Sequence, residues 1–211
     1  MLTVYGRANS INVRKVLWML DEVGEPYARQ DWGRGYRATS EPEFMAFSTF
    51  GVVPVIDDDG FVLRESHTIV RYLATKHRRT DLYPSGLKPR ALAEAWMDWG
   101  QTDLYAAARP VFHAMIVTAK DPKTAIAPAD GVAAWTTQMQ RLEATLKPSG
   151  KGGGPYLMGP DFTIADIPVG LVVNRWFTLK FEKPALPAVQ GYYDRLAERP
   201  AYRAHGRNGT P

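Results

Sequence analysis

Strand-forming segments are confined to the first 80 residues of this chain, and this asymmetry restricts the possible folds more than any other feature. LTVY at 2–5 is a short β-type run that ends in a polar turn. An apolar helix face follows with the spacing i, i+3, i+4 and i+7, formed by Val13, Val16, Leu17 and Leu20. Gly24 is predicted to end this helix, and 27–32 is predicted to be a second strand.

A β-hairpin and another helix complete this first part. The apolar runs 54–56 and 61–63 flank Asp-Asp-Asp-Gly, in which Gly60 can adopt a positive φ. Ser66 is predicted to cap a helix whose inward face is Ile69, Val70 and Leu73. Residues 33–53 form a long connection with one short helix predicted around PEFMAF. A β-α-β unit followed by a β-β-α unit is a thioredoxin-like arrangement, which we predict to span 1–80.

Beyond a linker at 81–88 the strand signal disappears, and residues 89–211 are predicted to be an all-α domain. Two helices are indicated by apolar faces, one containing Leu92, Ala95, Trp96 and Trp99, and one containing Val132, Trp135, Met139, Leu142 and Leu146. The fold class is therefore an α/β thioredoxin-like domain followed by a helical domain.

Polar and proline signals divide the end of the chain. TIAD at 163–166 is similar to a capping box, in which Thr163 and Asp166 can satisfy each other's backbone donors. Pro187 is predicted to open the last helix and Pro200 to close it, which leaves 201–211 as a loose tail. GKGGG at 150–154 lacks the other residues of a phosphate-binding loop and is predicted to be a flexible connection.

The absence of cysteine excludes disulfides, thiolate metal sites and a protein-thiol nucleophile. The four histidines show no metal-ligand spacing, so no metal is expected. The net charge of +4 is spread along the chain, which argues against a nucleic-acid partner. There is no signal-peptide pattern and no apolar run approaching the roughly 20 residues of a membrane span, so we expect a cytoplasmic protein without a membrane partner.

Three blocks of this sequence resemble the cytosolic glutathione transferases. YGRANSINVRKVLWMLDEVGEPY is similar to the family's first strand, catalytic turn and first helix. FGVVPVIDDDGFVLRESHTIVRYLA resembles its signature G-x-V-P-x-L followed by L-x-E-S-x-A-I-x-x-Y-L, and YLMGPDFTIADIPVG resembles the C-terminal folding motif. The Ser/Asn turn is most similar to serine-type bacterial branches, theta-like or nu-like.

The resemblance implies where glutathione binds. A cis Val53–Pro54 bond would expose the Val53 backbone to pair with the cysteinyl residue of the peptide, as an added strand does. Glu65 and Ser66 would hold the γ-glutamyl end, although on the residues alone they also suit a surface acid beside an ordinary helix cap. The glycine end needs a cation from the 33–53 loop, for which Arg34 and Arg37 are candidates; a solvated loop charge is the alternative for each.

Because the chain has no thiol, the reactive sulfur would come from glutathione itself. A free thiol has a pKa near ~8.5 and is mostly protonated at pH 7. Ser10 stands just before the first helix, where its hydroxyl and the helix dipole could both stabilise a thiolate. Asn12 is a close second candidate through its amide, and either residue could instead be a plain cap. Tyr5 lies within the strand, where a core role is favoured.

The electrophile is expected to meet the helical domain at Tyr105, Arg109 and Phe112, which recur at helical spacing. For Arg109 a salt bridge or a solvated charge is an equal alternative. The resemblance implies a glutathione transferase that acts on a small hydrophobic electrophile, and a homodimer. Glutathione-dependent peroxide or disulfide reduction and a non-catalytic ligand-binding protein of the same fold are the other two hypotheses.

Overall fold

A computed structural model describes residues 1–147 and 154–211, which form two compact units, Met1–Tyr83 and Pro84–Pro211. The division falls within the stretch expected to be a linker. The predicted flexible connection at 150–154 lies, except for Gly154, outside the described residues.

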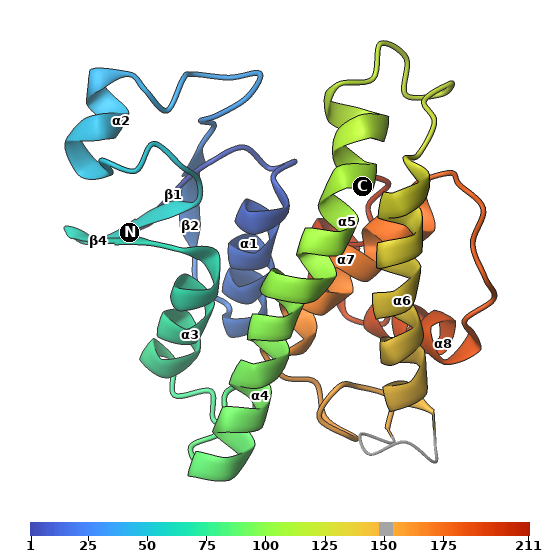
Figure 1. The fold of residues 1–211 in the computed structure, drawn as a ribbon. Coiled ribbons are helices and arrows are strands. Elements are labelled where there is room, and N and C mark those ends of the chain that lie inside the picture. Colours follow the sequence, from blue (N-terminus) through green and yellow to red (C-terminus); the bar gives the residue numbers. More distant parts are fainter. Residues whose placement is uncertain (148–153) are drawn as a thin grey trace. The chain divides into compact units, whose positions relative to one another are not determined.

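The first unit has the predicted βαβ-ββα order (Figure 1). Its elements are β1 (Leu2–Tyr5), α1 (Ile11–Val23), β2 (Tyr27–Gln30), α2 (Pro42–Phe47), β3 (Val55–Asp58), β4 (Phe61–Arg64) and α3 (Ser66–Lys76). The strand order is β2-β1-β3-β4, in which β1 pairs parallel with β2 and antiparallel with β3, and β3 pairs antiparallel with β4. The second strand is shorter than the predicted 27–32 because Trp32 leaves the ladder and bridges to Arg37.

Both faces of this sheet are covered. Trp32, Phe44 and Val55 form a buried cluster between α2 and the sheet, completed by Tyr5, Phe47 and Val53. Because neighbouring strand residues point to opposite faces, the buried Ile56 belongs to the other face, on which α1 and α3 pack against each other (Figure 1). The hairpin turn has a positive φ at both Asp59 and Gly60, as a two-residue type I′ turn requires.

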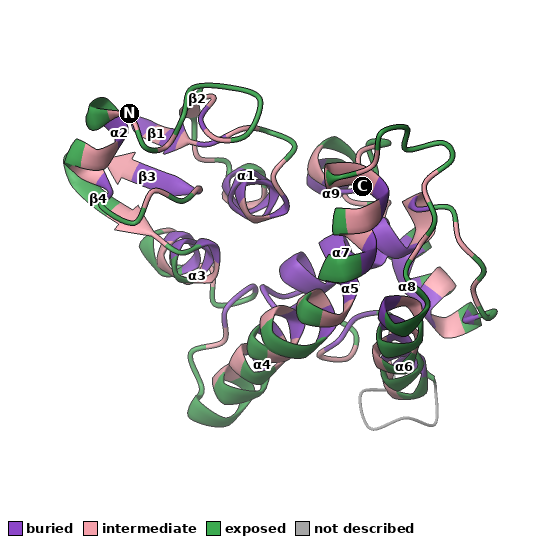
Figure 2. Ribbon diagram, turned by 45° about the horizontal axis from the view of Figure 1, so that its top comes forward, coloured by how far each residue is buried: buried purple, intermediate pink, exposed green. Residues whose placement is uncertain are grey.

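The second unit is all-helical, as predicted. Its elements are α4 (Leu87–Trp99), η1 (Gly100–Leu104), α5 (Tyr105–Phe112), η2 (His113–Val117), α6 (Ala129–Leu146), α7 (Asp166–Thr178), α8 (Pro187–Leu196) and α9 (Pro200–His205). The elements η1 and η2 are π-helical turns that continue α4 and α5 without a break in the helical backbone. In Figure 2 the long helix formed by α4 and α5 is exposed along one side, whereas α7 is purple over most of its length.

The helix α7 is the core of this unit, with every residue from Asp166 to Trp176 buried. A Cβ on Gly100 would lie 3.3 Å from Val169, so the glycine of the first π turn allows α4 and α7 to approach closely. Trp135, Trp176 and Phe181 form an aromatic cluster beside it, with ring centroids 5.2–5.6 Å apart.

The prediction of a loose C-terminal tail is wrong. Pro200 begins another helix, α9, instead of only closing α8. Tyr202 is fully buried and donates from its hydroxyl to the Gly170 carbonyl at 2.8 Å, and Asn174 donates from its side chain to the Thr210 carbonyl at 2.8 Å. The tail is ordered because α7 supplies hydrogen-bond partners far away in the sequence.

Candidate functional site

The polar turn before α1 is shaped by close packing at Gly6. A Cβ at this position would lie 2.5 Å from the Val13 side chain and 3.1 Å from that of Val53, and the residue has a φ of +149°. Only glycine fits here. The end of β1 therefore passes directly between α1 and the segment that contains Val53.

Ser10 occupies the N-cap position of α1 in an extended conformation, and its side chain makes no capping hydrogen bond. Its backbone is fixed on both sides, because the Ser10 N–H donates to the Arg7 carbonyl at 3.1 Å and the Arg14 N–H donates to the Ser10 carbonyl at 2.9 Å. The alternative of a plain side-chain cap is not what the structure shows. The hydroxyl lies on a fixed turn at the positive end of a 13-residue helix.

Asn12 lies in the first turn of α1 and is half-buried. Its Oδ1 is buried and has no hydrogen-bond partner among the described residues. A buried polar atom without a partner costs roughly 1–3 kcal/mol, so most are satisfied in native proteins. This oxygen is an acceptor, so it can gain from a ligand that donates a hydrogen bond to it.

The Val53–Pro54 peptide bond is cis, as the resemblance implied. Within the described part of the chain, neither the N–H nor the C=O of Val53 has a hydrogen-bond partner. The Val53 side chain packs against the core cluster under α2 and lies near Gly6 and Gly33. The structure therefore places an unpaired peptide edge beside the turn that carries Ser10.

Glu65 and Ser66 join β4 to α3. The N-cap is Glu65 and not Ser66, which corrects the predicted cap; Ser66 is the first residue of the helix and is 6% exposed. No side chain caps this helix, so Ser66 does not satisfy its first N–H groups. Glu65 has a φ of +72°, a conformation costing of order 1–3 kcal/mol for a residue with a side chain and found most often at functional sites.

The two candidates for the glycine end differ. Arg37 is paired with Glu41 and Glu43 and lies over the Trp32 ring at 4.0 Å. These hydrogen bonds, first to Glu43, raise the pKa of Arg37 and lower the pKa of Glu43. Arg34 is exposed on the loop. The sequence pattern could not distinguish the two arginines, because the ion pairs of Arg37 with Glu41 and Glu43 depend on the position of the short helix α2.

Arg7 was not identified as a site residue from the sequence. A Cβ on Gly33 would lie 2.7 Å from its NH1 atom and 3.7 Å from the Val53 side chain. Gly33 therefore lies close to both the Arg7 guanidinium and the Val53 side chain, and Arg7 belongs to the same turn as Ser10. No local sequence signal marks this position, because the proximity of Arg7 and Gly33 arises from the pairing of β1 with β2.

Tyr5 has the core position expected of it. Its ring lies 4.4 Å from that of Phe47, and burial, followed by the charge of Asp57, raises the pKa of its hydroxyl. Tyr5 thus belongs to the core cluster under α2, whereas Ser10 and Asn12 lie at the start of α1 and stay the candidates for the sulfur.

The expected electrophile residues all lie on α5 in the second unit. Arg175 of α7 connects two of them, because its guanidinium lies 3.6 Å from the Phe112 ring centroid and 5.8 Å from that of Tyr105. Arg109 is exposed, whereas Tyr105 and Phe112 are half-buried. Sequence reasoning missed Arg175 because an arginine inside an apolar helix is ordinarily a surface residue.

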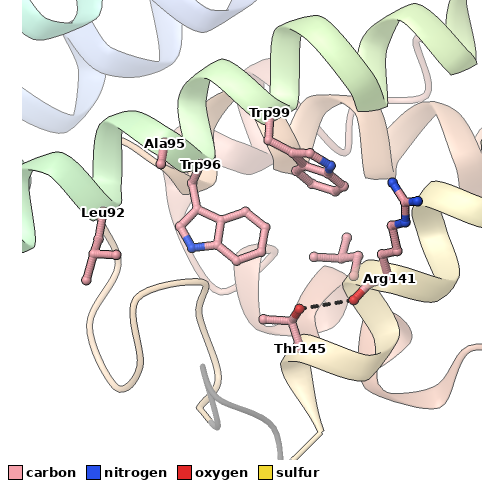
Figure 3. A pocket seen from close by; sticks show the side chains of 7 residues that line it. Leu92, Ala95, Trp96, Trp99, Arg141 and Thr145 are labelled. Atoms are coloured by element: carbon pink, nitrogen blue, oxygen red, sulfur yellow. Dashed lines mark hydrogen bonds between the residues drawn. The ribbon is translucent and has the colours of Figure 1, made fainter.

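A pocket of about 290 Å³ in the second unit contains none of these three residues (Figure 3). It lies between α4 and α6, where Trp96 and Trp99 face Arg141 and Thr145. The two indoles meet edge to face with centroids 5.3 Å apart. Trp135 and Trp176, by contrast, are core residues.

The part of the chain that the structure describes contains neither a metal-binding cluster nor a membrane-spanning helix. No group of three or more His, Cys, Asp or Glu side chains gathers in a way that could hold a metal ion. None of the helices there is both long and apolar enough to cross a membrane.

Comparisons with known proteins identify the family. Residues 9–76 match the family described as Glutathione S-transferase, N-terminal domain, and residues 106–200 match Glutathione S-transferase, C-terminal domain. Glutathione S-transferase GstB of Escherichia coli is 31% identical over 205 residues, 96% of each chain. Glutathione S-transferase 3 of Zea mays is 28% identical and covers 96% of this chain and 91% of its own length.

Solved structures give the same result. The theta class glutathione S-transferase from the citrus canker pathogen Xanthomonas axonopodis pv. citri, with glutathione bound, is 35% identical with a TM-score of 0.86, and the match covers 97% of this chain and 96% of that one. A delta-class glutathione transferase of Nilaparvata lugens has a TM-score of 0.87 over 100% and 95% of the two chains at 22% identity, which shows the fold alone.

Proposed function

The chain belongs to the glutathione S-transferase family, and from this premise we propose that it binds glutathione in its first unit and joins the glutathione sulfur to a small hydrophobic electrophile. The observation that carries the proposal is the Ser10 hydroxyl, held at the start of α1 but not used to cap it. A hydroxyl in that position can donate to a ligand sulfur. The half-buried amide of Asn12 on the same turn is the second donor.

The protein's task at the sulfur is to favour the thiolate. Each unit by which a thiol pKa falls needs about 1.4 kcal/mol of preference for the charged form. A hydrogen bond to a charged group contributes roughly 1.5–3 kcal/mol, and a helix N-terminus roughly 0.3–1 kcal/mol. Ser10 and the dipole of α1 together could therefore lower the pKa by about one to three units, of which the hydroxyl supplies about one to two. No protein base is needed.

The peptide is proposed to lie across three elements of the first unit. The unpaired backbone of Val53, before Pro54, would bind the cysteinyl residue, as an added strand binds a sheet edge. Glu65 would bind the γ-glutamyl ammonium, and Ser66 with the uncapped N–H groups of α3 would bind its carboxylate. Of the two loop arginines, Arg34 is favoured for the glycine carboxylate, since Arg37 already neutralises two acids.

The reaction is a direct displacement or addition. Glutathione loses its thiol proton to solvent, and the thiolate electron pair forms a C–S bond with the electrophilic carbon. A leaving group departs with its bonding pair, or the acceptor takes up the charge and is protonated by water. No covalent enzyme intermediate is involved, because the chain supplies no thiol.

The second unit is proposed to supply the electrophile site through Tyr105, Arg109 and Phe112. The two half-buried aromatic rings suit an apolar substrate, and Arg109 suits an anionic group on it. We also propose that the protein is a cytoplasmic homodimer, on the family relationship alone.

Three variants test the sulfur site by the ultraviolet thiolate band of bound glutathione. Ser10→Ala is expected to raise the apparent pKa of the bound thiol by one to two units, and Asn12→Ala by less. Asn9→Ala, an exposed residue of the same turn, is the control and should leave the pKa unchanged. If only Asn12→Ala abolishes the band, the roles of the two residues are reversed.

Product assays separate the three functional hypotheses. Thioether formation that falls with the thiolate band supports the transferase. A rate of peroxide or disulfide reduction that exceeds the rate of thioether formation favours a reductase. Binding of glutathione with no thiolate band and no turnover favours a non-catalytic protein, and no binding at millimolar glutathione contradicts every hypothesis that involves glutathione.

A further inference from the structure

A buried lysine joins the two helices that begin at the proposed glutathione site. Lys15 of α1 is 1% exposed, and its Nζ lies 3.0 Å from Nε2 of His67 in the first turn of α3. The two helices pack against each other along the same side of the sheet (Figure 1). A lysine is almost never fully buried unless it is paired, so this contact has a specific role.

The chemistry fixes which atom donates. Burial lowers the pKa of His67 to about 2, and the positive charges of Lys15 and Arg71 add to the effect. The imidazole is therefore neutral at physiological pH. Since an ammonium can only donate, Nε2 accepts from Lys15 and the ring proton is on Nδ1. Hydrogen bonds with a charged partner are the stronger and more directional kind.

The position of the pair relates it to the site. Lys15 lies on α1 just beyond Ser10 and Asn12, whereas His67 directly follows Ser66. The helices α1 and α3 contact each other, and both carry fully buried apolar side chains, among them Val16 and Val70. Burial of apolar surface is non-directional, whereas a hydrogen bond depends on distance and angle, so the Lys15–His67 contact adds a directional restraint between the helices.

We propose that Lys15 and His67 are positioning residues that hold the sulfur-binding turn of α1 at the correct distance from the γ-glutamyl-binding turn of α3. This inference rests on the proposed function, because it assigns both turns to one glutathione molecule. Neither side chain is placed against the peptide. Loss of the hydrogen bond would let glutathione bind at one turn without seating its sulfur at the other.

The test uses the full chain and glutathione itself. Lys15→Met and His67→Leu remove the hydrogen bond while keeping side chains of similar length or volume. Each is expected to raise the KM for glutathione about tenfold and to raise the pKa of the bound thiol by roughly half to one unit. Lys15→Arg and His67→Gln keep a donor or an acceptor and should restore most of both properties. The matched control is Lys76→Met. Lys76 also lies on α3, and this variant removes its partly exposed ion pair with Asp58 of β3.

The double variant Lys15→Met/His67→Leu decides whether the two residues act together. A shift in thiol pKa no larger than that of either single variant supports the proposal, whereas additive shifts overturn it. Thermal unfolding of each variant shows whether a loss is only of stability; if Lys15→Met does not fold, His67→Leu compared with His67→Gln carries the test, and equal thiol pKa values in these two overturn the proposal. A wild-type protein without a thiolate band contradicts the proposed function, whereas a wild-type band that is unchanged in Lys15→Met and His67→Leu contradicts only this inference.

Discussion

The helix starts of the two units are built differently. In the first unit, α1 and α3 begin at Ser10 and Glu65 without any capping side chain. In the second unit, the Asp166 carboxylate at the start of α7 accepts from the Thr163 and Leu157 N–H groups at 2.8 and 3.1 Å and from the Tyr192 hydroxyl at 3.1 Å. These three donors lie outside α7, whose N-cap residue Ala165 makes no capping bond either, so the carboxylate ties the preceding loop and α8 to the helix start. Polar groups paired inside a domain stabilise its fold, whereas helix N–H groups left open can bind an anion. The comparison separates two helix starts that we propose bind glutathione from one whose carboxylate stabilises the fold.

The largest expected effect is that of replacing Asp166, whose two carboxylate oxygens both have hydrogen-bond partners. Asp166→Ala leaves two backbone N–H groups and one hydroxyl buried without acceptors, which should lower the free energy of unfolding by roughly 3–5 kcal/mol. Chemical denaturation would measure it. Asp161→Ala, an exposed neighbour, is the control and should cost less than about 0.5 kcal/mol. A small loss at Asp166 would remove the distinction between the two kinds of helix start.

The second effect is the pH dependence of the same carboxyl. Burial raises the pKa of Asp166 to about 6 from 3.8, and the hydrogen bonds from Thr163, Leu157 and Tyr192 only partly oppose it. The folded state thus binds this proton more tightly than the unfolded chain does. The resulting stabilisation is complete below about pH 4 and is lost as the pH rises through about 6.

Asp166→Asn removes this titration. The free energy of unfolding of the wild type, measured relative to Asp166→Asn, should rise as the pH falls from 7 to 4. The difference is used because other carboxylates, such as Asp81 beside Arg79, have lowered pKa values and act in the opposite direction. A difference that is constant with pH would mean that the hydrogen bonds outweigh the burial of the carboxyl.

A third helix start extends the comparison. Glu143 of α6 is buried, and its Oε2 accepts from the Val189 N–H at 2.9 Å in the first turn of α8. Its Oε1 has no partner within the described residues. Glu143→Ala should therefore cost about 1–2 kcal/mol, as the loss of a helix cap does. Glu143→Gln keeps the acceptor and removes a buried charge, so equilibrium unfolding should show a change of less than about 1 kcal/mol.

Local patterns predicted the elements whose signals are local. The helix face from Val13 to Leu20, the end of α1 at Gly24 and the Asp59–Gly60 turn follow from periodicity and from a positive φ. The half of the predicted capping box that involves the Asp166 carboxylate and the Thr163 N–H is also present. The other half differs, because the Thr163 hydroxyl faces the same carboxylate at 3.4 Å instead of capping the helix.

Features that depend on distant partners could not be predicted. The tail is ordered because Tyr202 reaches the backbone of α7, a contact between residues 32 positions apart. The π turn at Gly100 reflects close packing on Val169, which helical periodicity does not encode. In the site, the proximity of Arg7 to Gly33 and the contact of Lys15 with His67 arise from tertiary packing. The ion pairs of Arg37 with Glu41 and Glu43 are local, but they depend on how the chain turns into α2.

The smallest expected change in stability is at Ser10, whose hydroxyl makes no capping hydrogen bond to α1. An N-cap serine that bonds to its helix costs about 0.5–2 kcal/mol when replaced by alanine. The Ser10 hydroxyl makes no such bond, so Ser10→Ala should lower the free energy of unfolding by less than about 0.5 kcal/mol, while the pKa of bound glutathione still rises. Denaturation and the thiolate band, recorded on the same preparation, would separate the two effects. A stability loss above about 1 kcal/mol would show that the hydroxyl caps α1 in solution, and the contrast between the unused hydroxyl of Ser10 and the fully paired carboxylate of Asp166 would then be lost.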